Sequence, residues 1–149
     1  MINLLKNMSL LIVFGVVPTV ALDYFSGSGF LDKFMSDQSL SMLGTILAIY
    51  IAAASSFIAI LNSYEDQEGK DIFSGTVKEL KQTIAFIFIV FFAHFLLLVG
   101  TPTEASFACD LALKSLKTFT FILFLYALYE LSSELFTLKN KLPRKDKKQ

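Results

Sequence analysis

Apolar runs without charged residues divide the chain into four long segments. The clearest run covers residues 38–62, which contain no Asp, Glu, Lys, Arg or His. At about 1.5 Å per residue, a helix of this length crosses the roughly 30 Å hydrocarbon layer of a bilayer. The other runs predict membrane helices over residues 4–22, 77–99 and, with charged flanks, around 118–129. The pattern therefore predicts an all-α fold, a four-helix transmembrane bundle.

One proline interrupts the first of these runs. Pro18 has no backbone N–H to donate and therefore predicts a kink near Val17.

The distribution of charge indicates which way the helices point. Residues 23–37 carry three Asp against one Lys, whereas residues 62–81 carry three Lys among five acids. The end of the chain, residues 139–149, is a basic tail: Lys139, Lys141, Arg144, Lys145, Lys147 and Lys148. Because basic residues collect on the cytoplasmic side of a membrane, we expect both termini in the cytoplasm. Residues 1–138 then form the transmembrane domain, and the tail either contacts anionic lipid or docks an acidic cytosolic partner or nucleic acid.

The turn after the third helix has two interpretations. Gly100 suits a helix C-terminus, and residues 101–104 (TPTE) match a capping box that would start the fourth helix at Pro102. A tight membrane hairpin would then bury three charges on one helical face, as in a pore or polar cavity: Asp110, Lys114 and Lys117. Alternatively, residues 102–115 form an amphipathic helix at the outer surface, and the crossing runs over residues 116–136.

Small residues recur at every fourth position of the second helix: Gly44, Ala48, Ala52 and Ser56. In lipid, small residues let helix backbones approach each other closely. This small-residue stripe predicts packing against the chain's own helices, or a homo-oligomer seam or pore-lining surface.

Three side chains with polar ends are expected near the middle of the predicted helices: Tyr50, His94 and Tyr126. A phenol or imidazole buried in hydrocarbon needs a hydrogen-bond partner. We expect the three to form a polar cluster at the bilayer midplane, either as structural hydrogen bonds or as a proton relay.

Two acids of like charge, Glu130 and Glu134, lie one turn apart at the inner end of the fourth helix. They form either a solvated helix end or a ring of carboxylates at the cytoplasmic end of a cation pathway.

Composition excludes several kinds of chemistry. The chain is 54% hydrophobic, with a mean hydropathy of +0.61 and no net charge. It has one Cys and one His, and it lacks a phosphate-binding loop, a zinc-protease motif and a convincing nucleophile with its base. We therefore expect a protein that is not an enzyme, without metal or cofactor.

The size, the four crossings with both ends inside and the short charged middle loop resemble a small group of phage-defence membrane proteins. The group includes KwaA, the membrane component of the Kiwa system, and RexB. The likeness to RexB lies in the small and aliphatic texture of residues 43–49 (LGTILAI) and 52–57 (AAASSF). A likeness to KwaA implies an oligomeric membrane sensor with a cytosolic effector that binds DNA. A likeness to RexB implies an ion-conducting pore.

The function expected from these features is that of a multi-pass subunit of an anti-phage defence complex in the bacterial inner membrane. Such a homo-oligomer would sense disturbance of the envelope and recruit a cytosolic effector, without binding nucleic acid itself. The alternative is an oligomeric ion channel that depolarises the inner membrane.

Overall fold

A computed structural model describes residues 7–68, 72–102 and 106–141 of the chain. All elements in these ranges are helices. Four of them are long and apolar enough to cross a membrane: Asn7–Ser26, Ser39–Gln67, Ser74–Val99 and Phe107–Thr137. The predicted all-helical fold with four potential membrane spans is therefore confirmed.

The first of these spans is not a regular α-helix. Leu11–Val16 form a π-helix, η1, and Val17–Ser26 form the α-helix α2, which ends at Gly27 with φ of 61°. Pro18 stands at the start of α2, where its missing N–H and its ring disturb the helical hydrogen bonding. The sequence predicts a kink near Val17, and the structure has its change from π- to α-helix at this residue.

A short helix, α3 (Phe30–Asp37), follows in the segment for which the sequence predicts a loop. Its Leu31 and Met35 are buried and pack with Val16 and Val20 in a small apolar cluster. This cluster holds α3 against the N-terminal span. A single residue, Gln38, separates α3 from the next helix.

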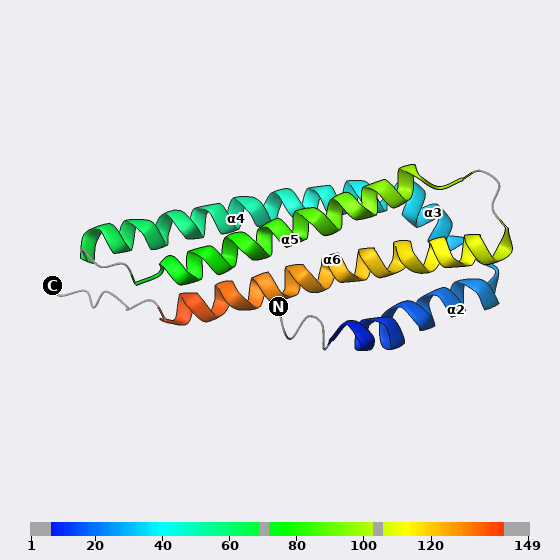
Figure 1. The fold of residues 1–149 in the computed structure, drawn as a ribbon, viewed down its shortest axis with the longest axis horizontal. Helices are drawn as coiled ribbons and strands as arrows, with labels where there is room; N and C mark the ends of the chain where they lie inside the picture. The colour runs from blue at the N-terminus through cyan, green and yellow to red at the C-terminus, as the bar shows by residue number, and fades with distance from the viewer. Residues whose placement is uncertain (1–6, 69–71, 103–105, 142–149) are drawn as a thin grey trace.

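The main bundle consists of α4 (Ser39–Glu68), α5 (Ser74–Val99) and α6 (Phe107–Lys141). Figure 1 shows these three helices side by side along the molecule, whereas the N-terminal span covers only the first half of α6. The main core lies between the three long helices and includes buried Leu43, Ile87, Phe124 and Leu131. With 35 residues, α6 is about 52 Å long, so it extends past a hydrocarbon layer of roughly 30 Å.

The start of α6 differs from both sequence interpretations. Gly100 ends α5 as predicted, with its N–H bonded to the Leu96 carbonyl at 2.8 Å, but Pro102 lies outside any helix. Residues 103–105 of the expected capping box lie outside the described residues. Ser106 precedes α6 instead, and its Oγ accepts the Cys109 N–H at 3.4 Å. Because α6 then continues unbroken, a separate surface helix ending at residue 115 is also absent.

The N-terminal span approaches α6 closely at a glycine. A Cβ added to Gly15 would lie 3.0 Å from Cδ1 of Ile122, which is tighter than ordinary van der Waals contact. Further along, Asn7 Nδ2 donates to the Tyr126 hydroxyl at 2.7 Å. The small side of Gly15 and the hydrogen bond of Asn7 therefore let the N-terminal span pack against α6 as far as about the middle of α6.

Candidate functional site

A groove of about 340 Å³ lies between α5 and α6, at the end of the bundle away from α3. Seven residues line it, and most of them are polar: Glu79, Gln82, Thr83, Phe86, Ala127, Glu130 and Glu134. The groove thus combines three carboxylates with an amide and a hydroxyl, although it lies on helices that are otherwise apolar.

Helical periodicity brings these side chains to one place. On α5, Glu79, Gln82, Thr83 and Phe86 follow the three- and four-residue spacing of a single helical face. On α6, Ala127, Glu130 and Glu134 likewise share one face. The two helices are antiparallel neighbours, so the polar start of α5 lies opposite the polar second half of α6 (Figure 1).

The groove is strongly negative. Glu134 is half-buried and interacts electrostatically with Glu130 on its own helix and Glu79 on α5. No Lys or Arg is among the residues that line the groove. Carboxylates that repel each other in a partly dry site are stabilised by a nearby cation or by a proton. Among the described residues, however, no three His, Cys, Asp or Glu side chains are arranged to hold a metal ion.

A chain of two hydrogen bonds connects this groove to the N-terminal span. The Tyr126 hydroxyl donates to Oε1 of Glu130 at 2.6 Å and accepts the bond from Asn7. This arrangement uses one oxygen of Glu130 and fixes its side chain at the edge of the groove.

The groove lies about one bilayer thickness from a second charged layer. Lys114 and Glu134 are separated by about 30 Å along α6, which matches the hydrocarbon thickness of a bilayer. Between these residues α6 has its uncharged stretch, residues 118–129. Two polar layers with an apolar band between them are the arrangement that a bilayer requires.

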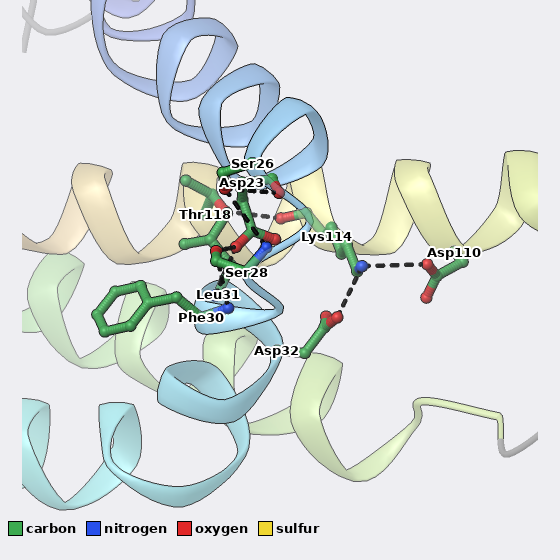
Figure 2. Close-up of polar contacts among 9 residues, drawn as sticks. All are labelled: Asp23, Ser26, Ser28, Phe30, Leu31, Asp32, Asp110, Lys114 and Thr118. Carbon is green, nitrogen blue, oxygen red and sulfur yellow. Dashed lines mark hydrogen bonds and ion pairs between the residues drawn. The ribbon is translucent and has the colours of Figure 1, made fainter.

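The second layer is an ion-pair clamp between α3 and α6. Lys114 Nζ lies 2.7 Å from Asp32 on α3 and 3.4 Å from Asp110 on α6. Figure 2 shows Lys114 between these two carboxylates. Lys117 is half-buried, and its charge acts on His94. The sequence left open whether Asp110, Lys114 and Lys117 line a pore or cavity or belong to a helix at the outer surface. In the structure Lys114 pairs with Asp32 of α3 and with Asp110 one turn away on its own helix, so the Lys114–Asp32 pair is the contact that joins α3 to α6.

The turn between α2 and α3 supports this clamp. Asp23 Oδ1 accepts bonds from the Ser28 hydroxyl at 2.7 Å and from the Leu31 N–H at 3.2 Å (Figure 2). These bonds satisfy backbone and side-chain groups at the start of α3. They also fix the direction of α3, which presents Asp32 to α6.

The three side chains expected to meet at the midplane are not brought together. Each has its own hydrogen-bond partners: Ser132 for Tyr50, Asn7 and Glu130 for Tyr126, and Ser39 and Thr120 for His94. The reason is that they lie at different positions along the bundle axis. The His94 partner Ser39 and Tyr50 both belong to α4, where they are about 16 Å apart along the axis.

The small-residue stripe on α4 faces mostly away from the rest of the chain. Gly44 is half-buried, and a Cβ added to it would lie 3.9 Å from the Phe91 ring. Ala48, Ala52 and Ser56 are exposed. Packing among the described residues therefore accounts for the glycine alone, and the other three residues are left exposed.

The predicted basic tail is mostly outside the described residues. Residues 142–149, with Arg144, Lys145, Lys147 and Lys148, belong to that part. Lys139 and Lys141 lie in the last turn of α6, for which only the backbone is described. Contact of the tail with lipid or a partner stays a prediction.

The chain matches no protein-family model, no curated protein and no solved structure. Its function therefore has to be argued from the groove and its surroundings.

Sequence reasoning identified the α6 side of the groove, Glu130 and Glu134, but missed the α5 side. The signal was present as the polar residues Glu79, Gln82 and Thr83 on one face at the start of an otherwise apolar helix. The pattern of one helix does not show how far its partner helix is shifted along the bundle axis.

Proposed function

We propose that this chain is a membrane protein without enzymatic activity that conducts cations across the bacterial inner membrane as a homo-oligomer. The groove between α5 and α6 carries this proposal. It gathers Glu79, Glu130 and Glu134 at one end of an apolar bundle, with no basic residue among those that line it. Acidic groups are costly near hydrocarbon unless they face water or other protein, and they are typical of ion pathways.

The groove offers a cation a graded environment. Carboxylates raise the local concentration of cations, while the amide of Gln82 and the hydroxyl of Thr83 provide oxygen ligands that replace part of a hydration shell. Three separated carboxylates favour a mobile, partly hydrated ion over one that is held tightly. This chemistry suits the entrance of a pathway for monovalent cations.

An ion pathway must also be enclosed by protein, which a single copy of this chain does not do. Among the described residues, the N-terminal span contacts α6 as far along as Tyr126, and the flank of α6 with Glu130 and Glu134 lies beyond this contact. Further copies would enclose this flank. Exposed Ala48, Ala52 and Ser56 on α4 allow a neighbouring helix to approach closely, which supports the assembly.

The charge pattern supports an orientation with both termini in the cytoplasm. Basic residues concentrate in the tail, and acids predominate around α3. In this orientation the groove opens toward the cytoplasm, and the clamp of Lys114 with Asp32 lies at the outer surface.

A second candidate function is that of a defence subunit that recruits a cytosolic effector. The hairpin of α4 and α5 favours it, because α4 continues about 27 Å beyond Tyr50, the residue that bonds to Ser132 of α6. Beside the connection between these two helices, the Glu65 side chain accepts the Phe73 N–H, and the Tyr64 and Phe73 rings are in contact. A charged helix end of this kind suits a docking platform. Both candidates fit a role in phage defence, which the resemblance to KwaA and RexB suggests.

Reconstitution in liposomes tests the first candidate against the second. Vesicles would carry a potassium diffusion potential set by valinomycin, with sodium outside and a voltage-sensitive dye. We expect the protein to collapse the potential quickly with external sodium and much more slowly when N-methylglucamine replaces sodium. If the potential persists as long as in protein-free vesicles at every protein density tried, the conduction proposal is rejected. The docking-platform function then remains.

A further inference from the structure

The only histidine of the chain lies in a buried site made by three helices. His94 of α5 and Ser39 of α4 are completely buried, and Thr120 of α6 is 8% exposed. The two ring nitrogens have separate partners: Nε2 lies 3.1 Å from Ser39 Oγ, and Nδ1 lies 2.8 Å from Thr120 Oγ1. Neither the groove nor the ion-pair clamp uses this site.

The hydroxyl protons at this site already have acceptors. Ser39 Oγ donates to the Met35 carbonyl at 2.7 Å, and Thr120 Oγ1 donates to the Lys117 carbonyl at 2.9 Å. A hydroxyl has one proton to donate, so each oxygen is left to accept from His94. All four contacts are satisfied together when both ring nitrogens carry a proton, which is the imidazolium form.

A neutral ring changes this arrangement. It has one N–H, so its other nitrogen must accept a hydrogen bond. One of the two hydroxyls then has to turn away from its carbonyl and donate to the ring. Loss of the proton at His94 therefore releases either Ser39 from Met35 or Thr120 from Lys117.

We propose that His94 is a proton-binding switch. As an imidazolium, the ring donates hydrogen bonds to both hydroxyls. As a neutral ring, it accepts a hydrogen bond from one hydroxyl, which then no longer donates to its backbone carbonyl. The Ser39 branch matters most for the fold, because the Ser39–Met35 bond spans the break at Gln38 between α3 and α4. Proton binding thus tightens the junction that orients α3. Exposed Asp37 and Gln38 bring water within one or two residues of Ser39.

The groups around His94 set the conditions for this switch. Among the described residues, Lys117 of α6 is the charged group that acts on His94, and its positive charge opposes a second one. The Phe121 ring, with its centroid 6.2 Å from the imidazole, also belongs to α6. On α4 the contact is the uncharged hydroxyl of Ser39. Burial and the charge of Lys117 disfavour the imidazolium, whereas the two prepared hydroxyl acceptors and the Lys117 backbone favour it.

The chain offers a clean experiment because it has one histidine. Full-length protein with ¹⁵N-labelled histidine, freed of any affinity tag, would be placed in lipid nanodiscs and titrated from about pH 8 to pH 4 by NMR. We expect the ring nitrogens to pass from neutral to imidazolium shifts while the protein stays folded. The protection factor of the amides near Ser39, which corrects exchange for its intrinsic pH dependence, is expected to rise over the same pH range. A ring that stays neutral until the protein unfolds would overturn the proposal.

Variants separate the prepared acceptors from a general effect of burial. Ser39→Ala and Thr120→Val each remove one acceptor, and the midpoint should fall by about one pH unit or more, the effect of losing one charged hydrogen bond. Thr120→Ser keeps the hydroxyl and should titrate like the parent protein. Ser56→Ala is the matched control, because it removes the same kind of bond on α4, to Ala52, away from His94. If all four variants titrated with the same midpoint, the two hydroxyls would not be the groups that stabilise the imidazolium.

Discussion

Replacement of Glu130 and Glu134 together by Gln is expected to lower sodium flux in the liposome assay at least about tenfold. Each Gln keeps the size of the side chain and one oxygen that can accept a hydrogen bond, but removes its charge. The groove would then keep one carboxylate, Glu79, on its exposed α5 edge. A tenfold change in rate corresponds to about 1.4 kcal/mol, which is modest for two charges close to a cation in a partly dry site.

Two controls make this result specific. The double change Asp66→Asn and Asp37→Asn removes the same amount of charge from exposed positions outside the groove, and it should leave the flux nearly unchanged. Tyr126→Phe removes the hydrogen bond to Glu130 but not its charge, so its effect should be small. If the Gln variant conducts as fast as the parent protein, the groove is not on the pathway.

Phe124→Ala is expected to produce the largest loss of stability, about 2–4 kcal/mol. Phe124 is completely buried in the main core, with its ring centroid 6.2 Å from that of Phe91. In lipid, transfer of a side chain away from water no longer drives helix association. The loss therefore comes from the cavity and the missing packing contacts, and it should fall in the lower part of the range known for soluble proteins.

The measurement is an SDS titration in mixed micelles, with pulse proteolysis to report the folded fraction. Phe88→Ala is the matched control, because Phe88 is 47% exposed on the surface of α5. Its change should cost less than about 0.5 kcal/mol, as is usual for an exposed position. Equal losses for the two variants would show that the core of α4, α5 and α6 does not hold the bundle together.

The membrane spans could be predicted because length without charge is a property of each helix alone. Their ends were harder to predict, because in this chain polar residues continue helices past the apolar run. Thus α4 extends to Glu68, and α6 begins after Ser106, although both segments contain charges. The same capping chemistry that the sequence suggested at residues 101–104 occurs a few residues later, at Ser106.

The contacts between helices could not be predicted, because they depend on how far each helix is shifted along its neighbour. Glu130 and Glu134 were recognised, but their partner Glu79 required knowing that the start of α5 lies opposite them. For the same reason Tyr50 and His94, which lie on antiparallel helices, were predicted to lie in one layer of the bundle. In the structure they lie in two different layers. The short α3 was missed because its apolar residues, such as Leu31 and Met35, lie among Gly, Ser and Asp in a segment that resembles a loop.

The docking of the N-terminal span on α6 has a consequence for biosynthesis. Asn7 and its partner Tyr126 are 119 residues apart in the chain. At about 5–20 residues per second, the ribosome needs roughly 6–24 s to make the second after the first. The first span remains without this partner for that time. Its exposed aliphatic and aromatic surface suits it to lie alone among lipid tails during this interval, and the synthesis of α6 then completes its packing.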